Sequence, residues 1–262
     1  MKLPVVLLYH VVAPCPPDAD LVEGNLFVEP SAFEQQMDDL AAQGYRTLTL
    51  DDYAAAVDGA PAPPKSVLLT FDDAYAHIDA VVSPILRRHQ FSAVMFASPA
   101  HLGGRNSWDR DHPNLARLEI ASREQLLEMS SGPWEIASHG LYHVDLRTIH
   151  PERRRAELVE ARDRLSHLVR KPVVDLAYPY GYDDPGIRED VREAGYRLAF
   201  VANPIRSLDP LRLSRHPVNG ADSLPIFRLK TADWSHGLYE MSGFAPSWVR
   251  TAARSVLGAG VR

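Results

Sequence analysis

Residues 66–71 form an apolar run that ends in two adjacent carboxylates, Asp72 and Asp73. The run is rich in β-forming residues and predicts a buried parallel strand. In α/β proteins, ligands bind at the carboxyl ends of such strands. Neighbouring side chains on an extended chain point in opposite directions, so we expect the two carboxylates to differ in role, one as a metal ligand and one as a base. The alternative is that one of them only caps the following helix.

Two histidines four residues apart, His139 and His143, follow a predicted strand over residues 134–137. On a helical turn, this spacing places both rings on one face, where they can bind the same metal ion. With Asp73 they would form a set of two imidazoles and one carboxylate, which suits zinc or another divalent metal and leaves coordination positions open. A histidine pair at this spacing also arises by chance, so the pair alone leaves a metal site and a coincidence equally open.

His10 also ends an apolar run, residues 5–9. It is either a catalytic group at the same edge as the carboxylates or a partly buried histidine bonded to the backbone. Residues 178–181 (Tyr-Pro-Tyr-Gly) carry no group that ionises near pH 7, but the backbone N–H of Tyr180 can be aimed at a developing oxyanion. The alternative there is an ordinary turn with two core tyrosines. Trp108 is either a surface for a sugar ring or a core residue.

Strand and helix patterns alternate along the chain, which predicts (β/α) units that close into a barrel or a strongly wound sheet. The remaining predicted strands cover residues 45–50, 91–96, 173–177, 197–201 and 211–215. We expect Ser31 to cap the first helix through a capping box and Asp51 or Asp52 to cap the second. Residues 11–29 read as a long, proline-rich loop of the kind that often binds ligands.

The size and composition favour one large α/β domain over residues 1–262, with residues 232–262 as a helical C-terminal tail. A net charge of −6 and the lack of a basic tract exclude a nucleic-acid-binding protein. One cysteine, Cys15, excludes an internal disulfide or a cysteine zinc cluster. No run is long enough to span a membrane, and the N-terminal apolar run is too short for a secretion signal. We therefore expect a cytoplasmic protein, or an extracytoplasmic one if a leader has been removed.

Taken together, the motifs at residues 70–73 (Thr-Phe-Asp-Asp), 139–143 (His-x-x-x-His) and 178–181 resemble the first three motifs of the polysaccharide deacetylases of the NodB-homology group. The likeness runs from about Pro4 to Phe227. It implies a distorted (β/α) barrel and a metal-dependent deacetylase acting on an acetylated carbohydrate, with Zn²⁺ as the expected cofactor and Co²⁺ or Ni²⁺ as alternatives. The roles that it implies are Asp72 as the general base, Asp73, His139 and His143 as metal ligands, and Tyr180, beside Pro179, as an oxyanion donor.

Many members of this family carry a late Leu-x-His motif whose histidine is the general acid. Here that motif occurs early, as Leu8-Tyr9-His10, in the manner of a permuted subgroup similar to the poly-N-acetylglucosamine deacetylases. On that basis the acid role falls to His10, with His216 as a weaker rival.

The sequence departs from the family pattern at three positions. Ala74 stands where glycine is usual, and Gly140 stands where a serine or threonine usually follows the first metal histidine. Ala177 replaces an arginine that orients the base, and Arg215 is a candidate substitute. An O-acetyl esterase, a non-sugar amidase and a carbohydrate-binding protein with a degenerate site therefore stand as alternatives to an N-deacetylase.

Overall fold

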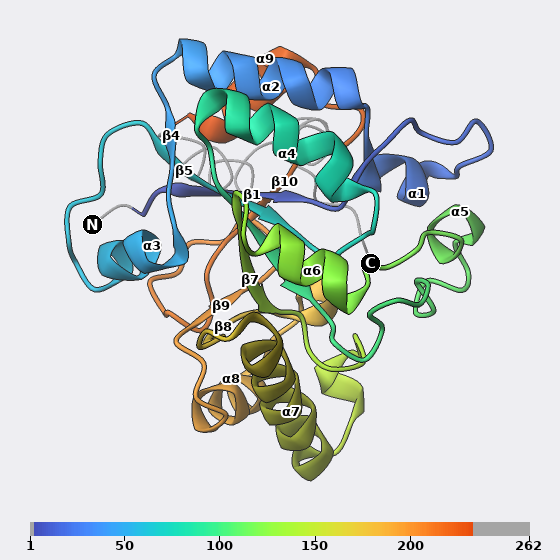
Figure 1. Cartoon of the computed structure of the whole chain (residues 1–262). Coiled ribbons are helices and arrows are strands. Elements are labelled where there is room, and N and C mark those ends of the chain that lie inside the picture. Colours follow the sequence, from blue (N-terminus) through green and yellow to red (C-terminus); the bar gives the residue numbers. More distant parts are fainter. Residues whose placement is uncertain (1–2, 233–262) are drawn as a thin grey trace, which may run out of the picture.

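The computed structural model describes residues 3–232, which are built around a parallel sheet of eight strands curled into a barrel (Figure 1). The strand order is β10-β1-β5-β6-β7-β8-β9, and β4 pairs with the first residues of β5. This architecture confirms the predicted distorted (β/α) barrel. The strands are β1 (Val5–Tyr9), β4 (Arg46–Thr47), β5 (Ser66–Phe71), β6 (Ala93–Ala97), β7 (Trp134–Ser138), β8 (Asp175–Ala177), β9 (Leu198–Phe200) and β10 (His216–Pro217).

A short segment, residues 213–217, closes the barrel by joining the two ends of the sheet. Leu213 forms a parallel bridge with Phe200 of β9, and His216 pairs with Leu7 of β1. The prediction of a regular strand over residues 211–215 is therefore wrong. The segment changes its pairing partner between residues 213 and 216, so neither neighbour holds a run long enough to form a strand there.

The helices cover the outside of the barrel (Figure 1). One group lies over β1, β5 and β6, and a second group lies over β8 and β9, while α3 lies near the amino ends of the strands. The first group consists of α2 (Pro30–Ala42), α4 (Ile78–His89) and α9 (Leu224–Thr231). The second group consists of α7 (Pro151–Val169) and α8 (Pro185–Glu193). Two further helices are α3 (Leu50–Val57) and α6 (Arg123–Met129). The predicted tail from residue 232 lies almost entirely outside the described residues.

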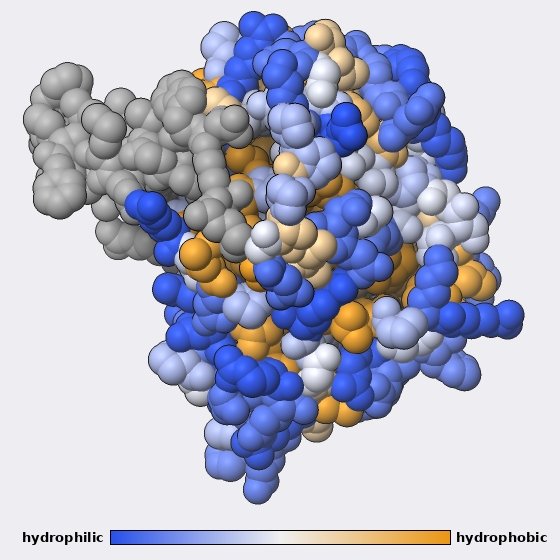
Figure 2. Space-filling model, turned by 90° about the vertical axis from the view of Figure 1, so that its left-hand side faces the viewer, coloured by the Kyte–Doolittle hydropathy of each residue, from blue (hydrophilic) through white to orange (hydrophobic). Residues whose placement is uncertain are grey.

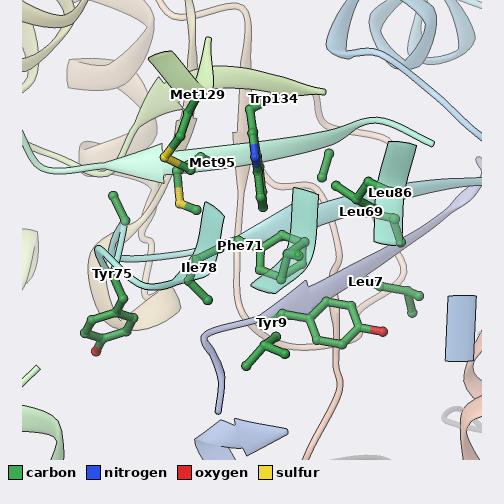
Figure 3. Close-up of a cluster of buried hydrophobic side chains, with 14 of the residues drawn as sticks. Leu7, Tyr9, Leu69, Phe71, Tyr75, Ile78, Leu86, Met95, Met129 and Trp134 are labelled. Carbon is green, nitrogen blue, oxygen red and sulfur yellow. The ribbon is translucent and has the colours of Figure 1, made fainter. Parts of the chain in front are cut away.

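Alternating side chains of the strands build three apolar clusters, one inside the barrel and two under the helices, of which one lies under α7 and α8. Inward-facing residues such as Leu68 and Phe96 fill the barrel together with Leu213 from the closing segment. Outward-facing residues pack under α2, α4 and α6, where Tyr9 and Phe71 stack with their ring centroids 5.0 Å apart (Figure 3). This alternation means that the side chain after Phe71, that of Asp72, returns to the barrel interior.

Three helix starts differ from the predicted caps. Helix α2 begins at Pro30 after Glu29, so Ser31 lies inside its first turn, and α3 is capped by Thr49 through a capping box with Asp52. The Thr49 side chain accepts the capping hydrogen bond that an aspartate was expected to accept. Asp51 and Asp52 instead lie in the first turn of α3, where the helix dipole favours negative charge. Helix α4 has His77 at its N-cap position, so neither carboxylate after β5 caps it.

The carboxyl ends of the strands carry the long connections. The segment after β1 contains β2 (Val11–Val12), α1 (Leu21–Leu26) and β3 (Phe27–Val28), and the segment after β6 contains α5 (Pro113–Ala116). Figure 1 shows α1 and α5 on the same side of the barrel. The opposite side, at the amino ends of the strands, is mostly hydrophilic, with its apolar side chains in separate small areas (Figure 2). Within residues 3–232, no helix has the length and apolar character needed to cross a membrane.

A group of charged side chains gathers at the amino ends of β7 and β8. Arg197 bonds to Asp175 and to Asp51, while Glu135 accepts a hydrogen bond from the backbone N–H of Leu50 at 3.2 Å. Burial raises the pKa of Glu135 to about 7, and the nearby aspartates also raise it. Glu135 is therefore a carboxyl group that the folded state prefers in its neutral form.

We expect the variant Glu135→Gln to be more stable than wild type at pH 8, by about 1 kcal/mol after allowance for the partial exposure of this side chain, and to show no gain below pH 4.5. The folded-state pKa lies above the unfolded one, so Glu135 lowers stability progressively as the pH rises from about 4.5 to about 7. Denaturant unfolding at pH 4.5 and pH 8 measures the difference. Glu128→Gln, at an exposed position on α6, is the control, and a Glu135→Gln variant less stable than wild type at pH 8 would contradict the assignment.

Candidate active site

Asp72 is held inside the barrel by a buried arginine from the closing segment. Both of its oxygens accept hydrogen bonds from Arg215, Oδ1 from Nη1 at 2.7 Å and Oδ2 from Nη2 at 2.9 Å. The third nitrogen of the Arg215 guanidinium, Nε, donates a hydrogen bond to the carbonyl oxygen of Val201 at 3.1 Å, which fixes the plane of the guanidinium. Burial acts to raise the pKa of Asp72, but Arg215 and then His139 outweigh it and lower that pKa to about 2. Asp72 is therefore an ionised carboxylate in one orientation.

The strand ends in an unusual turn immediately after Asp72. Asp73 and Ala74 both have positive φ, 73° and 54°, a conformation that costs an L-residue roughly 1–2 kcal/mol. Backbone bonds on both sides of the turn offset this cost, from Ala121 N–H to the Ala74 carbonyl and from Ala76 N–H to the Glu119 carbonyl, each at 2.8 Å. Glycine, which is usual at this position in the family, would adopt the conformation of Ala74 without strain. The alanine at position 74 therefore carries a conformational cost that glycine would avoid.

Asp73, His139 and His143 are buried and form a group that could hold a metal ion, with one donor atom of each within 4.8 Å of the others. His139 Nδ1 lies 2.8 Å from the carbonyl oxygen of Ala177. A carbonyl only accepts, so Nδ1 carries the proton and Nε2 presents its lone pair to the site. His143 Nε2 lies 3.3 Å from Asp73 Oδ1.

The charge of this group fits a divalent cation. Burial, then Asp72 and Asp109, raise the pKa of Asp73 well above its usual value, and burial lowers the pKa values of both histidines. Asp73 Oδ1 is buried and finds no hydrogen-bond partner within the described part of the chain. Arg215, the guanidinium that residues 3–232 bring to the site, is committed to Asp72. A cation between the three donors would satisfy the orphan oxygen and favour the ionised carboxylate and neutral imidazoles.

The turn between the two histidines favours a glycine. Gly140 has a φ of 74°, and a Cβ there would lie 3.2 Å from Cγ of Pro179. His143 also has a positive φ, 50°, which turns its ring back toward His139, with the ring centroids 4.7 Å apart. The serine or threonine usual at position 140 would meet both strain and crowding.

His10 follows β1, which pairs with β5, so it lies beside the carboxylates. It is partly exposed. Burial lowers the pKa of His10 to about 4, opposed by the charge of Asp72 and assisted by Arg215 and His139. The rival His216 is fully buried.

Pro179 and Tyr180 form a tight turn, η2 (Pro179–Gly181), at the end of β8. Tyr180 has a φ of 60° and is 42% exposed, and its ring meets the edge of His143 with the centroids 4.8 Å apart. The following residue, Gly181, packs so closely on Ala202 that a Cβ would lie 2.3 Å from the alanine Cβ. This contact fixes the turn beside the metal donors.

An open cavity of about 530 Å³ leads to His143. The lining of this cavity includes His143 and four aromatic side chains, Trp108, Tyr142, Tyr180 and Tyr182. Trp108 stacks on His143 with the centroids 4.5 Å apart and the planes at 25°. Flat aromatic faces beside a polar centre are surfaces on which a sugar ring can stack.

Several residues of this cavity escape sequence reasoning. Tyr142 lies between the two histidines in the sequence, whereas Tyr182 becomes a cavity residue only through the turn that follows β8. Asp145 caps the short helix η1 (Leu146–Thr148) and pairs with Arg147, so its role in the fold is that of a cap.

In sequence, the chain is similar to known polysaccharide deacetylases. A family model described as polysaccharide deacetylase matches residues 59–199. A poly-beta-1,6-N-acetyl-D-glucosamine N-deacetylase of Staphylococcus aureus (strain MSSA476) is 25% identical over 185 residues, which cover 67% of this chain and 61% of that protein. The chain spans between 61% and 65% of the length of the first curated relatives that it matches.

Two solved structures share the fold. The Streptococcus pyogenes deacetylase PplD, in complex with acetate, superposes with a TM-score of 0.76 and 24% identity, over 88% of this chain and 98% of that one. IcaB from Ammonifex degensii gives a TM-score of 0.70 and 24% identity, over 88% and 100%.

The fold and the site define a (β/α) barrel with a candidate divalent-metal centre at the carboxyl ends of its strands. The family model covers more than half of the chain, and the chain belongs to the polysaccharide deacetylase family.

We expect the purified protein to bind about one divalent ion per chain and His139→Ala to lose it, because the variant removes one of three donors from a buried site. Elemental analysis after incubation with zinc and removal of excess ion measures this. His150→Ala, at an exposed position before α7, is the control and should retain the ion. Equal metal content in His139→Ala and wild type would contradict the site.

We expect Arg215→Met to lose about 3–5 kcal/mol of the free energy of unfolding, because it leaves the Asp72 carboxylate buried without a cation. The double variant Asp72→Asn with Arg215→Met should recover most of this loss, since it buries no charge. Urea unfolding at pH 7 measures both. Arg212→Met removes an ion pair with Asp183, which keeps Arg188 as a partner, and should cost less than 1 kcal/mol. No recovery in the double variant would show that Arg215 stabilises through packing alone.

Proposed function

We propose that this protein is a metal-dependent hydrolase that removes acetyl groups from the N-acetylated sugars of a glycan or glycoconjugate. The observation that carries the proposal is the pair of adjacent carboxylates with separate partners. Asp72 is ionised and oriented by Arg215, while Asp73 faces His139 and His143 with an oxygen left free. Amide hydrolysis needs both a base for water and an electrophile for the carbonyl oxygen, and the two carboxylates are suited to these two tasks.

Asp73, His139 and His143 would hold the ion, with Zn²⁺ as the first choice and Co²⁺ or Ni²⁺ as alternatives, because two imidazoles and one carboxylate suit all three. Such an ion supplies a Lewis acid that polarises the acetyl carbonyl and lowers the pKa of water at the site. The proton of Nδ1 on His139 is held by Ala177, so Nε2 needs no change of tautomer before binding.

The remaining chemistry belongs to the chain's own side chains. Asp72 would accept a proton from the attacking water, and the Tyr180 N–H would donate a hydrogen bond to the oxyanion as it forms. His10 would then protonate the leaving nitrogen as the C–N bond breaks. Burial keeps the pKa of His10 low, at about 4, so its imidazole is neutral near pH 7. Negative charge that develops on the substrate has to raise this pKa before the imidazole takes up a proton.

The aromatic cavity supports a sugar as the group that carries the acetamide. Tyr142 and Tyr180 are 48% and 42% exposed, although large aromatic side chains are normally covered, and they line the cavity together with Trp108. The N-deacetylase activity named for the Staphylococcus aureus relative supports an amide over an ester as the bond that is cut.

We expect the zinc-loaded protein to release acetate from β-1,6-linked N-acetylglucosamine oligomers, and Asp72→Asn to lower kcat by about 10²–10⁴ while it retains its metal, because the amide cannot accept the proton. Acetate release, measured beside metal content, separates the two effects. Asp38→Asn, an exposed position on α2, is the control.

The same assay with other substrates decides between the alternatives. Release only from an O-acetylated sugar would make the protein an esterase, and release only from a non-sugar acetamide would make it an amidase. Oligosaccharide binding without release of acetate under any metal would indicate a carbohydrate-binding protein.

A further inference from the structure

Asn106 is a buried amide outside the family motifs, in the segment between β6 and α6. It is 1% exposed, and all of its hydrogen-bonding capacity is used. Its Oδ1 accepts hydrogen bonds from the backbone N–H groups of Trp108, at 3.3 Å, and Asp109, at 3.1 Å. Its Nδ2 donates to the hydroxyl oxygen of Tyr75 at 3.0 Å and to Asp109 Oδ2 at 2.6 Å. Such full satisfaction is typical of a group that holds its neighbours in one arrangement.

The direction of each hydrogen bond in this cluster follows from chemistry. A backbone N–H can only donate, so the amide oxygen of Asn106 faces Trp108 and Asp109, and its nitrogen faces Tyr75. An amide nitrogen can only donate, so the Tyr75 oxygen accepts and the phenolic proton remains available. The neighbouring acceptor for that proton is the Asp73 carboxylate, with which the Tyr75 side chain interacts.

The Tyr75 ring is fixed independently of these hydrogen bonds. It is 1% exposed, and Tyr75 forms an antiparallel bridge with Ile120. Figure 3 shows the ring at the edge of the outer apolar cluster, with the hydroxyl pointing away from the other side chains. The hydroxyl therefore points out of the apolar cluster, where it accepts the hydrogen bond from Asn106.

Asn106 also acts on the opposite side of the metal donors. Its bond to the Trp108 backbone holds the indole that stacks on His143, with the ring centroids 4.5 Å apart. His143 Nδ1 is buried and finds no hydrogen-bond partner among residues 3–232, so contacts with the ring faces are what orient this imidazole. One buried amide therefore reaches two of the three donors, Asp73 through Tyr75 and His143 through Trp108.

We propose that Tyr75 and Asn106 are positioning residues for the metal site: Tyr75 engages one oxygen of Asp73 and leaves Oδ1 for the ion, and Asn106 holds both Tyr75 and Trp108 in place. This proposal rests on the metal site proposed above. Hydrogen bonds to the ligands of a metal orient them, and their loss typically lowers metal affinity by about 10–100-fold.

The test is the zinc affinity of Tyr75→Phe, measured by competition with a chromophoric chelator, together with the visible absorption of the cobalt-loaded protein. Tyr75→Phe keeps the packed ring and removes only the hydroxyl. We expect a 10–100-fold weaker zinc affinity, a changed cobalt spectrum and little change in Tm. Asn106→Ala should weaken zinc binding further, because it releases both arms, and should do so less in a Tyr75→Phe background than in wild type.

Tyr53→Phe is the matched control. Tyr53 is also a buried tyrosine, and its hydroxyl donates to the Pro4 carbonyl at 3.4 Å, near the amino end of β1. Zinc affinity and the cobalt spectrum should be unchanged in this variant. Wild-type affinity in Tyr75→Phe, or an equal loss in Tyr53→Phe, overturns the positioning role while the metal site stands. Absence of zinc binding by the wild type overturns both.

Discussion

The bidentate ion pair between Asp72 and Arg215 determines how the rest of the site is arranged. Taking a carboxylate out of water is costly unless a partner with matching geometry accepts its charge. Arg215 is completely buried, satisfies both oxygens of Asp72 and lies over the ring of Phe96 in the barrel core. Because Arg215 is used in this way, the next carboxylate, Asp73, has to find its compensation elsewhere.

That requirement explains the turn after β5. On a continuing strand, Asp73 would point out of the barrel into the apolar layer under the helices. Two residues with positive φ interrupt the strand and place Asp73 beside His139 and His143 instead. The strain of the turn is therefore tied to the site: it keeps two carboxylates of neighbouring residues on one side of the sheet, with different partners.

The sequence predicted those parts of the fold whose signals are local. The apolar runs of β1, β5, β6 and β7 are buried on both faces, so their composition alone identifies them, and the polar residues that follow mark the functional edge. The short elements were missed or misplaced because their pairing depends on neighbours far along the chain: β4 has two residues, and the closing segment pairs with β9 and then β1. The cluster of Tyr75 and Asn106 joins residues 31 positions apart, and no local pattern records such a contact.

The closing segment has a consequence for a chain that is made from its N-terminus. The candidate metal ligands Asp73, His139 and His143 and the carboxylate of Asp72 belong to the first 143 residues, whereas the arginine that pairs with Asp72 follows 72 residues after His143 (215 − 143). A nascent chain can therefore collect the three donors while the last gap of the barrel is still open and Asp72 still faces water. Closure of the ring and withdrawal of Asp72 from solvent then occur together, since residues 213–217 supply both the missing wall and the countercharge. Asp72 reaches its buried state only with its partner already in place, and an isolated buried carboxylate is avoided during synthesis.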